Sequence, residues 1–334
     1  MWHVGIDLHR VFVVIAAVHD NGEAMEPVRI ACSETEDILN AVRPLGRFRA
    51  VIEASGTYRW LYDLLRPHGT VLLAHPLRLR AMVQRRTKTD KLDAQLLANL
   101  LRINQIPLSY IPPEPYQRLR DLVRCRARMG REMAEIKIRL RAILARQNRQ
   151  APFRVPFGVR GLAWFRRQDF GLIENMVRDE LLARMTHFSQ QISTFDRHLT
   201  EMAHGFPQTE ALVDIHGIAL FSALLIVAEL GEVERFRTAK QVGAYSGLTS
   251  RVHQSGGHCY QGSITRQGSP WLRWILVQAA MKAVRDDAAL RNFYTRVRKR
   301  SGAKKARVAS ARKLAEICWK RLRHWHRTHV EQAA

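Results

Sequence analysis

The first hundred residues alternate between short apolar runs and polar turns, a pattern typical of an α/β domain. Five runs are predicted to form strands: residues 4–9, 11–18, 28–32, 49–54 and 71–74. Helices are expected over residues 34–42, from the turn at residues 55–57 through Leu65, and from Asp90 onward. The predicted succession of elements is therefore β-β-β-α-β-α-β-α.

This succession is that of the ribonuclease H fold. In that fold the first and fourth strands are neighbours, so Asp7 and Glu53 are expected to lie together. The late helix would bring Asp90 and Asp93 to the same point, because residues three apart share a helical face. Thr89 is the expected cap of this helix. Its apolar side is expected to be formed by Leu92, Leu96, Leu97, Leu100 and Leu101.

Four converging carboxylates repel one another unless cations neutralise them. The set Asp7, Glu53, Asp90 and Asp93 therefore predicts a site for two Mg2+ or Mn2+ ions, which would serve phosphoryl transfer. Taken alone, Asp90 and Asp93 fit an acidic helix start favoured by the macrodipole. The order of all four acids along the chain favours catalysis.

The middle of the chain, residues 111–205, has a different pattern. Apolar residues recur at alternating steps of three and four in two long runs, which is a coiled-coil period. The first run contains Leu119, Leu122, Met129, Met133, Ile136, Leu140 and Ile143, and the second contains Leu181, Met185, Phe188, Ile192, Phe195, Leu199 and Met202. Arg126 interrupts the first seam. The two helices would pair within one chain or with another copy, and residues 151–170 are expected to form an exposed connector.

A mainly helical domain is expected over residues 206–334. Residues 212–218, leading into a helix over 219–230, indicate half of a helix-hairpin-helix, a device that offers backbone N–H groups to phosphates. Further helices are expected over 236–244 and 271–284. Between them lies a polar, glycine-rich loop, in which Ser255 precedes two glycines.

Ser255 can either bind a backbone phosphate or act as a nucleophile, and its residue type does not decide between these roles. Arg251, Arg266 and Arg273 would balance phosphate charge there. Lys88, next to the acidic helix start, is the fourth residue expected to contact nucleic acid.

The formal net charge of +24 is carried mainly by the later part of the chain. Residues 1–100 hold 13 Lys and Arg against 11 Asp and Glu, whereas residues 285–334 hold 15 against 4. Such an excess predicts a polyanionic partner, DNA or RNA. An anionic membrane is the competing explanation, but no apolar run is long enough to span one. The dispersed Cys32, Cys125, Cys259 and Cys318 favour a reducing, cytoplasmic location.

The motifs together resemble a known family. G-I-D-L-H, E-A-S-G-T-Y, K-T-D-K-L-D-A, a central coiled coil and G-L-T-S-R…S-G-G…G-S-I-T-R-Q-G are similar to the transposases of the insertion-sequence 110 family, close to its 1111 subgroup. The same motifs resemble Piv-type DNA invertases.

The resemblance implies a RuvC-like DEDD domain over residues 1–110, a coiled coil for assembly over 111–205, and a transposase domain with a basic tail over 206–334. Carried over by position, the acids are Asp7, Glu53, Asp90 and Asp93, and the nucleophile is Ser255. Three other serines share the region: Ser246, Ser250 and Ser263. The resemblance also implies a tetramer built from dimers, a noncoding guide RNA, and work at the bacterial nucleoid.

The prediction is thus an RNA-guided DNA recombinase that forms a covalent phosphoserine intermediate. The alternative is a RuvC-like nuclease or Holliday-junction resolvase, in which water attacks and the serine only binds phosphate. A non-catalytic nucleic-acid binder is the third reading, and the presence of all four acids disfavours it.

Overall fold

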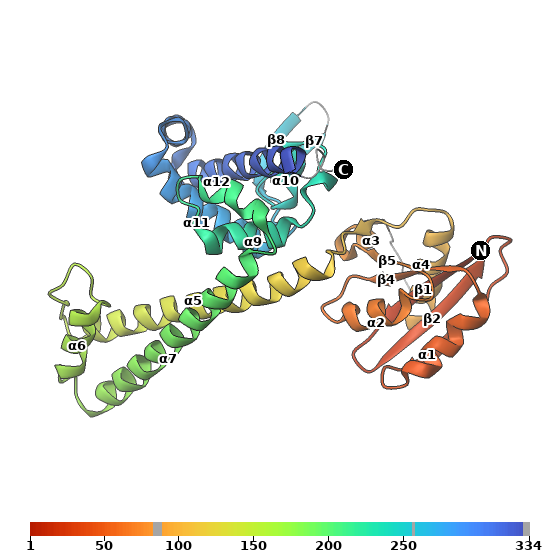
Figure 1. Cartoon of the computed structure of the whole chain (residues 1–334), viewed down its shortest axis with the longest axis horizontal. Helices are drawn as coiled ribbons and strands as arrows, with labels where there is room; N and C mark the ends of the chain where they lie inside the picture. Colours follow the sequence, from red (N-terminus) through yellow and green to blue (C-terminus); the bar gives the residue numbers. More distant parts are fainter. Residues whose placement is uncertain (83–88, 256–257, 330–334) are drawn as a thin grey trace. The chain divides into compact units, whose positions relative to one another are not determined.

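The computed structural model describes residues 1–82, 89–255 and 258–329 (Figure 1). The chain divides into two compact units, Met1–Ile111 and Pro112–Ala334. In the described ranges, no helix has both the length and the apolar character needed to cross a membrane.

The first unit is an α/β domain whose elements follow the predicted succession. The strands are β1 (Trp2–Leu8), β2 (Phe12–His19), β3 (Val28–Ala31), β4 (Phe48–Glu53), β5 (Thr70–Ala74) and the short β6 (Leu108–Ser109). The helices are α1 (Thr35–Val42), α2 (Tyr58–Leu65), α3 (Pro76–Met82) and α4 (Asp90–Arg102), with a 3-10 turn at Arg43–Leu45. The sequence pattern did not predict α3 and β6.

The strands form one mixed sheet in the order β3-β2-β1-β4-β5-β6. Strands β1, β4 and β5 are parallel, and the outer pairings are antiparallel. The register places Ile6 opposite Ile52, so Asp7 and Glu53 each follow a paired residue on neighbouring strands.

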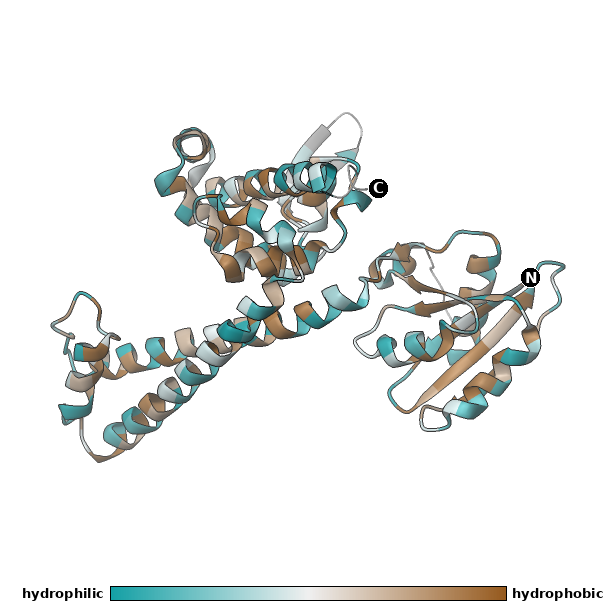
Figure 2. Ribbon diagram, viewed as in Figure 1, coloured by the Kyte–Doolittle hydropathy of each residue, from teal (hydrophilic) through white to brown (hydrophobic). Residues whose placement is uncertain are grey.

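Alternation along each strand divides the apolar residues between the two faces of this sheet. Ile6 and Ile52 belong to the core shared with α1 and α2. Val51 and Val14 face the other way and pack with residues of α4, such as Leu97 and Ala94. Figure 2 shows apolar residues along the central strands. Because Asp7 and Glu53 alternate with Ile6 and Ile52, their positions lie on the α4 side.

Helix α4 approaches β1 unusually closely at Gly5. A Cβ at this position would lie 2.1 Å from the carbonyl oxygen of Ala94 and 2.4 Å from the amide nitrogen of Ala98. Only glycine leaves room for this backbone contact. The small buried Ala94 and Ala98 complete the contact surface of α4. Leu92, which was predicted to face the core, is 36% exposed, whereas Leu97 and Leu101 of the predicted apolar side are buried against the sheet.

The second unit begins with a long helical hairpin of α5 (Glu114–Arg146) and α7 (Leu172–Ala203). The helices run antiparallel: Arg126 binds Asp196 through two hydrogen bonds of 2.9 and 3.1 Å, while Leu140 and Ile143 pack with Leu181. Of the two pairings left open by the sequence, the one within a single chain is therefore present. Arg126 interrupts the seam because it forms an ion pair across it.

The segment 151–170, expected to be an exposed connector, is partly helical and partly buried. Helix α6 (Val159–Arg167) forms within it, and Phe165 and Phe170 are 0% and 4% exposed in the core between α5 and α7. The prediction was wrong because the aromatic residues of this segment close the end of the hairpin.

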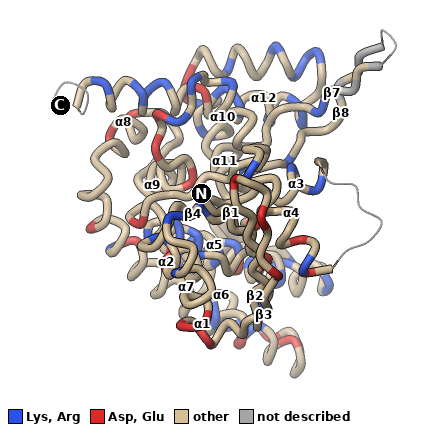
Figure 3. Tube along the Cα trace, turned by 90° about the vertical axis from the view of Figure 1, so that its right-hand side faces the viewer, with Lys and Arg blue, Asp and Glu red and all other residues tan. Residues whose placement is uncertain are grey.

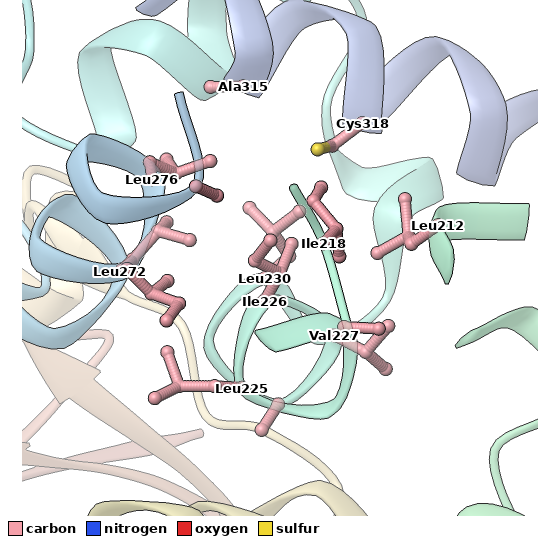
Figure 4. Close-up of a cluster of buried hydrophobic side chains, with 14 of the residues drawn as sticks. Leu212, Ile218, Leu225, Ile226, Val227, Leu230, Leu272, Leu276, Ala315 and Cys318 are labelled. Atoms are coloured by element: carbon pink, nitrogen blue, oxygen red, sulfur yellow. The ribbon is translucent and has the colours of Figure 1, made fainter. Parts of the chain in front are cut away.

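The remaining elements are mainly helical. They are α8 (Glu210–Val213), α9 (Leu220–Leu230), α10 (Ala239–Tyr245), β7 (Ser250–Ser255), β8 (His258–Ile264), α11 (Pro270–Asp286) and α12 (Ala288–His329), with 3-10 turns at Pro207–Thr209 and Val233–Arg235. Helix α9 is buried from Ala223 to Leu230 and occupies the centre of this core, next to Leu272, Leu276 and Cys318 (Figure 4).

A buried ion pair joins the helical hairpin to α9. Arg124 contacts both carboxylate oxygens of Glu229 at 2.6 and 2.9 Å, and Glu229 is 1% exposed. Burial lowers the pKa of the Arg124 guanidinium, but its hydrogen bond and charge interaction with Glu229 outweigh burial and raise it. Arg120 donates to the carbonyl oxygens of Ala228 and Glu229 at 2.6 and 2.8 Å, which satisfies the C-terminal end of α9.

One prediction for this unit is corrected by its secondary structure. The expected polar loop contains a two-stranded hairpin, β7 and β8, with Ser255 opposite His258. The predicted basic tail lies within α12, a helix that is broken at Gly302, where φ is 82°. After this break, Ala311, Leu314, Cys318 and Leu322 pack against the core. The predicted boundary between residues 205 and 206 stays a prediction.

We expect Gly5→Ala to destabilise the first unit by about 2–3 kcal/mol, because the added methyl group would overlap backbone atoms that cannot move independently. Urea unfolding monitored by circular dichroism measures this loss. Gly56→Ala is the matched control, since a Cβ there meets nothing within 4 Å, and its effect should stay under about 0.5 kcal/mol. Equal effects of the two substitutions would contradict the close approach.

Candidate metal centre and nucleic-acid surfaces

A compact group of metal-binding side chains lies where β1 ends and α4 begins. Among the described residues, ligand atoms of Asp7, His9 and Asp90 all lie within 4.8 Å of one another. His9 Nε2 is 3.0 Å from Asp7 Oδ2 and 3.3 Å from Asp90 Oδ1. The Asp7 side chain is 17% exposed, and the Asp90 side chain is 44% exposed.

The start of α4 presents two acids toward this group. Thr89 caps the helix as predicted, its hydroxyl accepting a hydrogen bond from the Leu92 N–H at 3.3 Å. Asp90 and Asp93 occupy the first turn. Their negative charge is favourable there, because the helix macrodipole is positive at its N-terminus.

The pKa of Asp7 is influenced by both other aspartates of this region, Asp90 and Asp93. Burial raises the pKa of the Asp7 carboxyl, the charge and hydrogen bond of His9 lower it, and the charges of Asp93 and Asp90 raise it again. The net result is a raised pKa. Burial is the largest of these effects, so the ionised form of Asp7 is less favourable here than in water.

The position of Glu53 is set by the register of the sheet. Glu53 is the last residue of β4, half-buried, and follows the pair Ile6 and Ile52. Within the part of the chain that the structure describes, neither Glu53 nor Asp93 belongs to the group with ligand atoms within 4.8 Å. The structure thus brings Asp7 and Asp90 together directly, and Glu53 through strand register.

The donor set fits a divalent cation. Carboxylate oxygens and an imidazole nitrogen are ordinary ligands of Mg2+, Mn2+ and related ions. The partly buried Asp7 with its raised pKa is a carboxylate that a bound cation would stabilise in its ionised form. Asp7 and Asp90 are the residues that would hold such an ion.

Ser255 is the last residue of β7, at the point where the hairpin reaches residues 256 and 257, which lie outside the described residues. Ser246 is 0% exposed, and its hydroxyl donates to the Gly243 carbonyl oxygen at 2.8 Å. Ser250 is half-buried at the base of the hairpin, and Ser263 is exposed on β8. Burial thus disfavours Ser246 among the alternatives to Ser255.

The base of this hairpin is built on two glycines with positive φ. A Cβ on Gly247 would meet the Gln267 carbonyl oxygen at 2.3 Å, and one on Gly268 would meet the Tyr245 carbonyl oxygen at 1.8 Å. Because two backbone segments touch here, the glycines anchor the hairpin to the helical core.

The arginines expected to bind phosphate have different surroundings. Arg251 and Arg266 are exposed, and Arg266 adopts φ 55°. Arg273 is half-buried and donates to the carbonyl oxygens of Ser246 and Arg266 at 3.2 and 3.4 Å. Burial, and then the Arg266 charge, lower the pKa of its guanidinium. Arg273 therefore supports the base of the hairpin, and Lys88 lies outside the described residues.

Comparison with known proteins relates both halves of the chain to transposases. A family model described as "Transposase IS116/IS110/IS902 family" matches residues 209–295, and a model described as a transposase, of the IS110 DEDD type, matches residues 4–148. The chain belongs to the IS110 family of transposases.

Individual relatives support this membership of the IS110 family. A putative transposase of Sinorhizobium fredii is 26% identical over 330 residues, which cover 95% of this chain and 78% of the relative. A probable family 20 transposase of Pseudomonas aeruginosa is 24% identical, with 95% of each chain covered. A pilin gene-inverting protein of Moraxella bovis is 25% identical over 80% of this chain and 78% of the relative.

Two features of this IS110-family chain were missed in the sequence. The first is His9, whose spacing of two from Asp7 in G-I-D-L-H was the available signal. The second is that part of the basic charge predicted for residues 285–334 forms a face on the first part of α12, where an open hollow is lined by Asn292, Thr295, Arg296, Lys299 and Arg300. These positions recur at helical steps, and residues 288–315 contain no Asp or Glu. Figure 3 shows Lys and Arg recurring along α12.

We expect Asp7→Asn to stabilise the cation-free protein at neutral pH. The pKa of Asp7 in the folded protein lies above the ordinary aspartate value of 3.8, so its ionised form opposes folding. This penalty is complete above the folded-state pKa and absent well below 3.8. The gain in Tm in the presence of EDTA should therefore appear at about pH 7 and vanish at about pH 3.

Thermal unfolding of the two proteins across this pH range measures the difference. Asp37→Asn is the control, because Asp37 is an exposed acid of the same unit and should give no gain. A lower Tm for Asp7→Asn at neutral pH would mean that the hydrogen bond to His9 outweighs burial and repulsion.

Proposed function

We propose that this chain cuts and rejoins DNA strands in transposition or site-specific recombination. In this proposal Asp7, Glu53, Asp90 and Asp93 hold two Mg2+ or Mn2+ ions, and Ser255 is the nucleophile. The observation that carries this proposal is the convergence of Asp7 and Asp90 in a chain of the IS110 transposase family.

The fold of the first unit supports the metal half of the proposal. We infer a ribonuclease H-like, RuvC-like domain, because the order of elements and the parallel neighbours β1 and β4 match that fold. This topology puts Glu53 beside Asp7 and α4 on the same side of the sheet. The four acids would then surround one phosphate-binding point.

The proposed chemistry has two balanced steps. The Ser255 hydroxyl oxygen attacks the scissile phosphorus while its proton passes to a base; the Oγ–P bond forms, and the bond to the leaving sugar oxygen breaks as that oxygen takes up a proton. A hydroxyl of another DNA strand then attacks the same phosphorus, loses its proton and releases serine. Cations held by the four acids would neutralise negative charge on the phosphate oxygens.

Basic surfaces of the second unit support the choice of substrate. The exposed Arg251 lies on β7 together with Ser255, the exposed Arg266 follows β8, and the α12 face presents Arg296, Lys299 and Arg300. Side chains of this kind bind phosphodiester backbones. We further propose that a noncoding guide RNA occupies part of this basic surface. We expect the protein to work in a bacterial cytoplasm. Sequencing the RNA that copurifies with the protein from bacterial cells tests the proposed guide RNA.

We also propose that copies of the chain assemble, as dimers that join into a tetramer. The first turns of α7 expose Leu172, Ile173 and Met176 by 77%, 65% and 64%. An exposed apolar group on a helix of a single chain is typical of an interaction surface. Different copies would then supply the acids and the serine to one phosphate.

A second candidate function is a RuvC-like nuclease or junction resolvase with water as the nucleophile. The same acid cluster favours it, because two-metal sites activate water as readily as a hydroxyl. The fate of the cut strand distinguishes the two functions.

Incubation of the protein with end-labelled DNA that carries the ends of its own element should give a covalent protein–DNA adduct after denaturation. Ser255→Ala should abolish the adduct, while Ser263→Ala, on the neighbouring strand β8, should retain it. Asp90→Asn should reduce adduct formation by at least about 100-fold, because one metal-binding carboxylate is lost. An adduct formed by Ser255→Ala would exclude this serine, and cleavage without any adduct would favour the nuclease.

Replacing Arg296, Lys299 and Arg300 with alanine should weaken binding of duplex DNA to a similar extent for unrelated sequences. The slope of log K against log salt should become shallower by about 2–3, roughly one for each lost phosphate contact. Fluorescence anisotropy at several salt concentrations measures this slope.

Removing three exposed arginines near α6, Arg154, Arg166 and Arg167, is the matched control, because it lowers the net charge by the same amount. Its slope should remain near that of the unmodified protein. Equal slopes for the two triple variants would mean that net charge, rather than the α12 face, governs binding.

A further inference from the structure

The imidazole of His9 lies between two carboxylates at the end of β1. One nitrogen, Nε2, is 3.0 Å from an oxygen of Asp7 and 3.3 Å from an oxygen of Asp90. The ring therefore directs a single atom toward both acids.

The surroundings of His9 hold the ring in this position. Its backbone N–H donates to the Phe12 carbonyl oxygen at 3.0 Å, and its ring stacks on Phe12 with 4.4 Å between centroids. Arg29 lies 3.6 Å above the Phe12 ring. The turn from β1 to β2 thus places the imidazole over the acids, although its side chain remains 38% exposed.

Two of the distances among the three donor atoms match the edges of a metal coordination shell. Two ligands at right angles around a cation, each about 2.1 Å away, lie about 3.0 Å apart. The two distances from Nε2, 3.0 and 3.3 Å, are close to that edge. The same distances also suit hydrogen bonds, so a purely positioning role is the alternative.

We propose that His9 is a direct ligand of a divalent cation held with Asp7 and Asp90, and that its nitrogen makes the centre prefer Mn2+ over Mg2+. Imidazole suits transition metals, whereas Mg2+ favours carboxylate, carbonyl and water oxygens. This inference rests on the metal half of the proposed function and does not involve Ser255 or a guide RNA.

The test uses the full chain without nucleic acid. Mn2+ binding is measured by electron paramagnetic resonance of the free ion, and Mg2+ binding by competition. His9→Ala should weaken Mn2+ binding by about tenfold or more and change Mg2+ binding by less than about threefold. His68→Ala is the control, because His68 is exposed on the same unit and should change neither.

Spin-echo spectroscopy of bound Mn2+ gives a direct reading of the ligand. The unmodified protein should show modulation from a coordinated imidazole nitrogen, and His9→Ala should lose it. His9→Gln separates the two roles, because a glutamine amide can hydrogen-bond the carboxylates but supplies no imidazole nitrogen. Restoration of Mn2+ binding by His9→Gln would overturn the proposal in favour of a positioning role.

Three further outcomes would also overturn it: no nitrogen modulation in the unmodified protein, unchanged Mn2+ binding by His9→Ala, or no Mn2+ binding at all. The Asp7→Asn variant shows whether such a result excludes only His9 as a ligand or excludes the metal centre as a whole. If Asp7→Asn abolishes Mn2+ binding and His9→Ala does not, the carboxylate centre stands without His9. If neither substitution changes Mn2+ binding, the centre is also excluded.

Discussion

The candidate metal centre depends on the contact between β1 and α4 at Gly5. With no Cβ in the way, the backbone of α4 lies directly on the strand, beside Ala94 and Ala98. The first turn of the helix is thereby fixed near the end of β1, where Asp7 and His9 lie. Since donor atoms must converge to within a few ångströms to share a cation, a larger residue at Gly5 would separate the two halves of the centre.

Acidic side chains have different surroundings in the two units of this chain. A protein of net charge +24 keeps three aspartates together at one sheet edge, where burial and mutual repulsion raise the pKa of Asp7. A bound cation would stabilise the ionised form of Asp7 in this arrangement. The second unit buries charge differently: Glu229 is 1% exposed, but Arg124 contacts both of its oxygens, so this pair serves structure. The aspartate cluster around Asp7, rather than the Arg124–Glu229 ion pair, is therefore the candidate for chemistry.

The sequence pattern was most informative where local periodicity and burial agree. The strands around Ile6 and Ile52, the Thr89 cap and the two long helices were predicted correctly, because each depends on residues close in the chain. Prediction failed where distant contacts decide the structure. Phe165 and Phe170 turned a supposed connector into core, and the segment ending at Ser255 became a strand because it pairs with β8. The role of Arg126 became clear only once Asp196 lay opposite it.

By itself, the sequence determined the types of most elements, the strongly basic character of the second half and the presence of four acids in a recognisable order. These properties follow from residue type and spacing. The tertiary structure alone decided that Asp7 and Asp90 share a site with His9, that α5 and α7 pair within one chain, and that Ser246 is buried. Each of these depends on atoms far apart in the chain coming within a few ångströms, and packing rather than local preference controls such distances.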